Sequence, residues 1–148
     1  YWCNINKEGD LIAKLDKSAV QITGSMDIDQ KEEILEAFGN CEIKRLITKP
    51  TITAFGLNWQ HCHHTTYFPT YSYEQYYQSI RRFYRYGQMN DVIVDLIHSD
   101  GQTRLLDSLF AKAQKADETY SMLNSALNQS FEIVKKEAKT EFQLPSFL

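Results

Sequence analysis

The chain has 148 residues, of which 43% are hydrophobic and 24% are charged, and its formal net charge is -3. This composition fits one soluble domain with appendages, and no apolar run approaches the roughly 20 residues of a membrane span. Three cysteines (Cys3, Cys41 and Cys62) without a CxxC pair argue against a disulfide framework and predict a reducing, cytoplasmic compartment. We expect no signal peptide. Because the sequence opens with Tyr1 rather than Met, directly in an apolar, strand-like pattern, we expect a fragment of a longer protein.

Strand and helix patterns alternate along the first two thirds of the chain. Strands are predicted over residues 1–5, 18–23, 43–48, 65–68 and 91–98, and helices over 8–16, 29–38 and 72–87. The last of these helices has Ser72 as its N-cap and Gly87 at its end. A polar helical pattern, one helix or two, covers 103–139 before an extended tail. Regular alternation predicts an α/β fold with a mainly parallel sheet flanked by helices on both faces, and ligands at the carboxyl ends of the strands.

The loop "TITAFGLNWQHC" (51–62) is the first candidate site. Gly56 permits a tight backbone, and the amides of Asn58 and Gln60 stand beside it as donors and acceptors. The loop could open a helix N-terminus that receives an anion. An ordinary connection between two elements explains the same residues equally well.

The run "QSIRRFYRYGQ" (78–88) is the second candidate site. Residues 41–88 carry six basic and two acidic side chains, whereas the flanking thirds are both acidic, so positive charge is concentrated here. Spacing predicts that Gln78, Arg82 and Arg85 project from one side of a helix. Guanidinium groups pair bidentately with phosphate oxygens, so the run indicates a phosphate site. The alternative is a solvated basic face that pairs with acids such as Glu74.

Three stretches in order resemble motifs of superfamily 2 helicases. "QSIRRFYRYGQ" is similar to the Q-x-x-x-R-x-x-R-x-G-Q form of motif VI in Swi/Snf-type translocases and their phage-encoded relatives, and "KPTITAFGLNWQHC" resembles motif V. "YWCNINKEGDLIAKL" resembles motif IV. The resemblance covers residues 1–98 and implies a RecA-like second motor domain of three layers, with residues 99–148 as a C-terminal helical extension.

The resemblance also implies roles for individual residues. Arg82 and Arg85 would be catalytic arginine fingers, and the ATP-facing surface would include Gln78, Gly56 and Asn58. The motif V loop with its neighbours Lys49, Leu57, Asn58 and Gln60 would contact nucleic acid. Gln75 and Gln88 match flanking positions of motif VI.

The sequence lacks a G-x-x-x-x-G-K-[ST] phosphate loop and an acidic D-E-x-H box. In the family both lie on the first motor domain. The resemblance therefore implies ATP and Mg²⁺ as cofactors of the full-length parent only, with DNA and the N-terminal RecA-like domain as partners, and an isolated fragment without activity. The motif forms suggest a phage or prophage protein of DNA replication or repair, in the cytoplasm of a bacterial or infected host cell.

Other interpretations of the same residues stay open. The "HCHH" run at 61–64 suggests zinc, but adjacent ligands diverge and no second pair follows, so we expect no metal site. The aromatic stretch 67–77 could stack bases, although core packing is favoured. The long helix could contact nucleic acid, the missing domain or a second copy, or pack back on the domain. A non-catalytic nucleic-acid-binding or protein-interaction module of the same fold is the alternative function.

Overall fold

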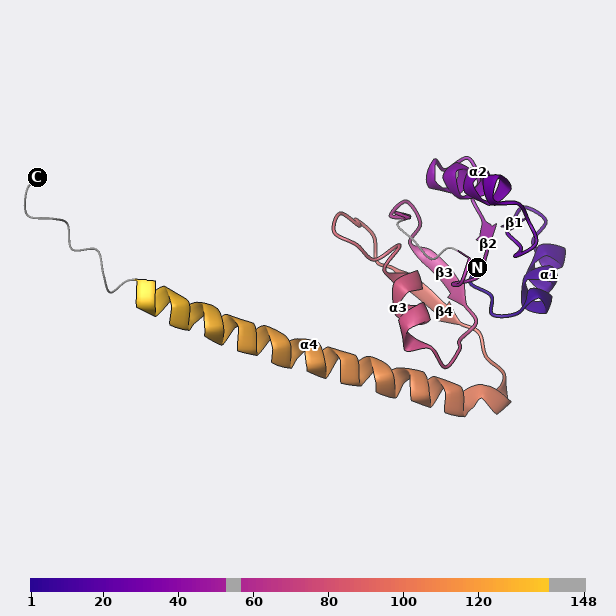
Figure 1. Ribbon diagram of the computed structural model, residues 1–148. Coiled ribbons are helices and arrows are strands. Elements are labelled where there is room, and N and C mark those ends of the chain that lie inside the picture. The colour runs from indigo at the N-terminus through magenta and orange to yellow at the C-terminus, as the bar shows by residue number, and fades with distance from the viewer. Residues whose placement is uncertain (53–56, 139–148) are drawn as a thin grey trace, which may run out of the picture. The chain divides into compact units, whose positions relative to one another are not determined.

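The computed structural model in Figure 1 describes residues 1–52 and 57–138, with side chains described through residue 128. The chain forms two compact units, Tyr1–Leu109 and Phe110–Leu148. All described strands belong to the first unit. The predicted boundary between residues 98 and 99 stays a prediction.

Parallel strands form the centre of the first unit. β1 (Val20–Gln21) pairs with β2 (Leu46–Ile47), and β3 (His64–Tyr67) pairs with β4 (Ile93–Leu96), both in parallel. Trp2 joins the two pairs, because it bridges Thr48 on one side and Tyr67 on the other. The spatial order is therefore β1, β2, the Trp2 segment, β3 and β4, which confirms the predicted parallel arrangement. Regular pairing covers two residues in β1 and β2 and four in β3 and β4, which is fewer than predicted for every strand except β3, and the predicted strand 1–5 forms only the bridges of Trp2.

The helices α1 (Asn6–Leu15) and α2 (Ile28–Gly39) follow the Trp2 segment and β1. Glu8 caps the start of α1, since its Oε2 accepts hydrogen bonds from the backbone N–H groups of Asn4 (2.7 Å) and Ile5 (3.0 Å). Gly9 lets α1 approach the strands closely, because a Cβ there would lie 2.7 Å from Gln21 Nε2. Both helices confirm the sequence prediction within two residues.

An aromatic core fixes the remaining loops to the strands. The buried cluster consists of Trp2, Ile22, Phe38, Leu46, Trp59, Tyr67 and Phe83. Trp59 is central to it, with ring centroids 5.7 Å from Trp2, 5.1 Å from Phe38 and 5.9 Å from Phe83. Burying each such ring contributes about 1.5–3 kcal/mol. The loop that contains Trp59 and the segment that contains Phe83 are thus held on the same core.

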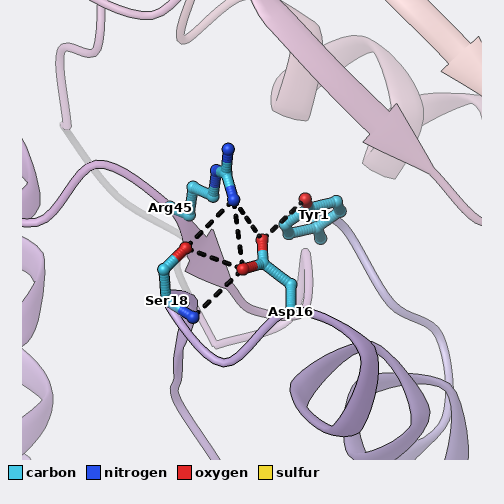
Figure 2. A network of polar contacts seen from close by, with 4 residues as sticks. All are labelled: Tyr1, Asp16, Ser18 and Arg45. Atoms are coloured by element: carbon cyan, nitrogen blue, oxygen red, sulfur yellow. Dashed lines mark hydrogen bonds and ion pairs between the residues drawn. The ribbon is translucent and has the colours of Figure 1, made fainter.

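A polar network, here called the Asp16 clamp, ties the turn after α1 to the start of β2 and to the N-terminus (Figure 2). The Asp16 carboxylate accepts hydrogen bonds from Ser18 Oγ (2.7 Å), Ser18 N (3.0 Å), Tyr1 Oη (3.0 Å) and Arg45 Nη1 (3.1 Å). These bonds, those from Ser18 above all, lower the pKa of Asp16 to about 2.

The C-terminal helix α4 (Thr103–Ala138) follows a short 3₁₀ turn at Asp100–Gln102. It is one continuous helix, so of the two predicted forms the single helix is observed. Leu105 and Leu109 are buried at its start. The large apolar side chains that are exposed further along its described part are those of Phe110, Tyr120, Met122, Leu123 and Leu127. Among the described residues, no helix combines the length and the apolar character that crossing a bilayer requires. The role of α4 stays open.

Candidate functional site

Helix α3 (Tyr73–Ile80) leads into the arginine run but ends before it. Ser72 is the N-cap, as predicted, and its Oγ accepts a hydrogen bond from Gln75 N (3.3 Å). Beyond Ile80 the backbone tightens: Arg82 N donates to Ser79 O (3.3 Å) and Phe83 N to Ile80 O (3.0 Å). These i to i−3 bonds interrupt the regular α-helical pattern, although Tyr84 N still donates to Ile80 O (2.9 Å). The predicted helix over 72–87 is therefore wrong in its last seven residues, which form turns.

Because α3 ends at Ile80, Gln78, Arg82 and Arg85 do not share a helix face. Gln78 is exposed on α3, Arg82 is only 7% exposed, and Arg85 is exposed in the turns that follow. The prediction of one common helical face is wrong. The roles assigned to the three residues do not depend on that face and remain predictions.

Arg82 lies against Trp59 of the preceding loop. Its Cζ atom is 5.6 Å from the centroid of the Trp59 ring, a cation–π distance, and its carbonyl accepts a hydrogen bond from Trp59 N (3.0 Å). Burial, and after it the positive charge of Arg85, lowers the pKa of the Arg82 guanidinium below its ordinary value. A guanidinium still carries its charge at neutral pH. The segment thus holds two like charges close together, one covered and one exposed.

Two glutamine side chains, here called the amide tie, connect the loop 57–62 to the turns 81–88. Gln60 Nε2 donates to the carbonyl of Tyr86. Gln88 Nε2 donates in the opposite direction, to the carbonyls of Gln60 (3.0 Å) and Cys62 (3.4 Å), and also to that of Phe83 (3.2 Å). The two candidate segments of the sequence are therefore one structural unit.

Gly87 makes the turn under the amide tie possible. Its φ of 94° lies in a region that residues with a Cβ rarely adopt. A Cβ there would also lie 3.4 Å from Gln60 Nε2. Gly87 thus sets the path of the chain between Arg85 and Gln88, whose backbone groups are joined by a hydrogen bond of 3.0 Å.

The other predicted site residues are distributed around this unit. Leu57 is half-buried and packs on the aromatic core, and Asn58 is exposed, with its Nδ2 donating to Gln60 Oε1 (3.2 Å). Lys49 lies two residues after the end of β2. Its Nζ donates a hydrogen bond to Asn6 Oδ1 at the start of α1 (2.6 Å). Gly56 lies outside the described residues. Asn58 and Gln60 are therefore joined to the arginine segment, whereas Lys49 belongs to the edge beside α1.

Sequence reasoning misses two residues that organise the site. The sequence pattern assigns no role to Trp59 within the motif V loop. In the structure its ring packs against Arg82 and belongs to the buried core. Gln88 is only a flanking position of motif VI. A large aromatic within a polar loop, and an amide directly after a turn glycine, are the signals that could have drawn attention to them.

The histidine run does not converge. His61 packs edge-on against Phe38 with ring centroids 4.9 Å apart, and burial lowers its pKa. Cys62 Sγ donates to His64 O (3.3 Å), and His64 Nε2 lies 2.6 Å from Asp95 Oδ2 across the β3–β4 pair. Within residues 1–52 and 57–128, whose side chains the structure describes, no group of three or more His, Cys, Asp or Glu side chains could hold a metal ion.

The aromatic stretch 67–77 divides between packing and exposure. Tyr67 is fully buried and packs edge-on against Tyr76, with centroids 5.3 Å apart, and burial raises the pKa of Tyr67 to about 12. Tyr71 is 61% exposed. Tyr73 and Tyr77 form a second ring pair, with centroids 5.9 Å apart, so ring packing is observed for four of the aromatic side chains. Beyond the stretch, Tyr84 and Tyr86 are also exposed, beside Arg85.

A hollow of about 990 Å³ lies near the amino ends of β2 and β3. Arg45, Trp59, His61, His64 and Phe83 are among its lining residues, but Arg82 and Arg85 are not. The volume alone does not mark a site, since none of the predicted site residues lines it. The candidate site is therefore the arginine segment with the amides of the neighbouring loop. Guanidinium and amide N–H groups are donors that suit phosphate oxygens.

Comparison with known proteins places these motifs in a family. The family profile of the helicase conserved C-terminal domain matches residues 2–87, more than half of the chain. A solved structure, the C-terminal part of the Fun30 ATPase domain, is similar with a TM-score of 0.59 and 18% identity. The match covers 71% of this chain and 36% of that one, and it shows the fold, a RecA-like C-terminal helicase domain. A search of curated proteins returned no match. The chain belongs to the helicase conserved C-terminal domain family.

Proposed function

We propose that this chain is the second motor domain of an ATP-dependent DNA helicase or translocase of the Swi/Snf type. The observation that carries the proposal is the amide tie, which joins the loop 57–62 to the segment with Arg82 and Arg85. A domain that only bound nucleic acid would have no need to link that loop to two adjacent guanidinium groups. In this proposal the link lets a movement of the loop reach the segment with the two arginines.

In this proposal Arg85 reaches the phosphates of a nucleotide presented by another domain. It is exposed, cannot lose its proton at neutral pH and offers a planar fork to two oxygens. Arg82 adds positive charge from its covered position against Trp59, and Gln78 and Asn58 offer amide groups at the exposed surface. Together these residues neutralise the charge that develops during phosphoryl transfer.

The side chains fit the triphosphate of ATP and not its metal ion. Arg82 and Arg85 are cations, which match phosphate oxygens, whereas Mg²⁺ requires oxygen ligands such as carboxylates. In our proposal, the phosphate loop and the acidic residues for Mg²⁺ come from an N-terminal RecA-like domain of the same parent protein. The bound nucleotide supplies the phosphoryl group, and this chain supplies charge and position.

Nucleic-acid contact is assigned to the loop beside the amide tie. Asn58 is exposed there, and Gln60 links the loop to Tyr86. Leu57 anchors the loop on the core, and Lys49 offers a cation at the strand edge. We assign DNA as the nucleic acid, and a phage or prophage origin with a role in replication or repair, on the forms of the motifs alone.

The experiment is ATP turnover of the full-length parent with and without single- or double-stranded DNA. Arg82→Ala and Arg85→Ala are compared with Arg81→Ala, a matched control whose guanidinium instead lies over Tyr77 at 5.8 Å. We expect DNA to stimulate turnover and each of the first two substitutions to lower kcat by about 10³ or more. Arg81→Ala should change kcat less than threefold, and the isolated chain should show no turnover. Unchanged turnover in both Arg82→Ala and Arg85→Ala would overturn the proposal.

One observation favours a second candidate, a non-catalytic binding module. Arg82 is 7% exposed and lies against Trp59, as a structural arginine would. Under this alternative the parent lacks ATPase activity, while the exposed Arg85, Tyr84 and Tyr86 contact a nucleic-acid strand directly. Tight DNA binding without any turnover in the parent would select it.

A further inference from the structure

Three backbone carbonyls from two separate segments converge on one side chain, that of Gln88. The carbonyls of Gln60 and Cys62 belong to the loop, and that of Phe83 lies between the two arginines. All three oxygens lie 3.0–3.4 Å from Gln88 Nε2, which has two N–H groups to share among them. The Nε2 group of Gln88 thus joins these two segments.

The other end of the same amide is also engaged. Gln88 Oε1 accepts a hydrogen bond from Asn90 N (3.0 Å), and this fixes which end of the amide faces the carbonyls. A carboxylate at this position could accept from Asn90 but could not donate to the carbonyls, and an ammonium could donate but could not accept. The site therefore requires a neutral amide of this length.

We propose that Gln88 is a positioning residue that couples DNA binding at the loop 57–62 to the placement of Arg82 and Arg85. The inference rests on the proposed function. A displacement of the loop moves the carbonyls of Gln60 and Cys62, and Gln88 transmits this movement to the carbonyl of Phe83 and the turns beside it. Gln88 itself contacts neither nucleotide nor DNA.

The test uses the full-length parent with Gln88→Glu and Gln88→Met. The first variant keeps the shape and the acceptor but loses the N–H donors, and the second removes both polar functions without adding charge. Gln30→Glu, at an exposed position of α2, is the matched control. ATP turnover is measured with and without double-stranded DNA, and thermal denaturation reports folding.

We expect both Gln88 variants to lower turnover with DNA far more than turnover without DNA. The ratio of DNA-stimulated to unstimulated turnover should fall on the order of tenfold, while Gln30→Glu keeps the wild-type ratio. If one variant does not fold, the other decides. An unchanged ratio, an equal loss of both rates, or loss of folding in both variants would overturn the inference, because Gln88 would then be dispensable or merely structural.

Arg85→Ala in the same assay separates the two proposals. If it abolishes turnover while the Gln88 variants keep the wild-type ratio, only the coupling inference fails. If Arg85→Ala leaves turnover intact, the proposed function fails, and the inference fails with it.

Discussion

The Asp16 clamp and the amide tie are both polar networks that join segments distant in sequence, but they differ in chemistry. The clamp gathers a carboxylate, a guanidinium and two hydroxyl groups, and its strength depends on ionisation and salt. The tie consists of neutral amides and carbonyls, which do not titrate. The clamp joins elements of the sheet, whereas the tie joins the two segments that carry the proposed site. We therefore expect the clamp to affect stability alone and the tie to affect activity.

Trp59 anchors the loop of the amide tie in the aromatic core, so its replacement should have the largest effect on stability. Trp59→Ala deletes a fully buried ring that contacts Trp2, Phe38, Phe83 and Arg82. We expect the free energy of unfolding to fall by ~3–5 kcal/mol. Chemical denaturation of the chain measures it, with Trp59→Phe as the control that retains an aromatic ring and should lose less than half as much. A loss below about 1 kcal/mol for Trp59→Ala would show that the ring does not anchor the loop.

Gly87→Ala should weaken the turn beneath the tie by a smaller amount. The φ of 94° strains any residue with a Cβ, and the new methyl group would lie 3.4 Å from the Gln60 amide. We expect a loss of ~1–3 kcal/mol. Gly24→Ala is the matched control, since a Cβ at that position would have no neighbouring atom within 4 Å. Equal denaturation midpoints for the two variants would contradict this account of the turn.

The smallest effect is expected at the clamp, and it should depend on pH. The pKa of Asp16 falls from 3.8 to about 2 on folding, so the carboxylate stabilises the folded chain above pH 3.8. This contribution is lost as the pH falls toward 2. Asp16→Asn should therefore lower Tm at neutral pH and converge with the wild type near pH 2, whereas Glu33→Gln, at an exposed position, should follow the wild type throughout. A Tm difference between Asp16→Asn and the wild type that does not change with pH would show that the charge of Asp16 does not contribute to stability.

The features that the sequence alone could predict are those that depend on residues close together in the chain. Periodicity predicted the order of elements and the parallel pairing, because the apolar residues of buried strands and helices repeat locally. Ser72 was predicted as an N-cap for the same reason, since a cap depends on neighbours a few residues away. The motifs also assigned both 51–62 and 78–88 to the candidate site, and this assignment stays a prediction.

Features that depend on tertiary contacts were not predictable. The run 72–87 has helical spacing throughout, yet the helix ends at Ile80, where the chain turns to place Phe83 on the core. The partners of Gln88 are backbone carbonyls, which no sequence pattern distinguishes. Trp2 occupies the middle of the strand order because it pairs with Thr48 and Tyr67, which lie far along the chain.

The most direct test of the central claim separates catalysis from nucleotide binding in Arg85→Ala of the full-length protein. Nucleotide affinity is measured by titration and kcat by DNA-stimulated ATP turnover, with Asp16→Asn as a variant of the other network. We predict that kcat falls by about 10³ or more while the Kd for ATP changes less than tenfold, and that Asp16→Asn retains wild-type kcat. A kcat for Arg85→Ala within threefold of the wild type would contradict the assignment of the arginine segment to ATP hydrolysis.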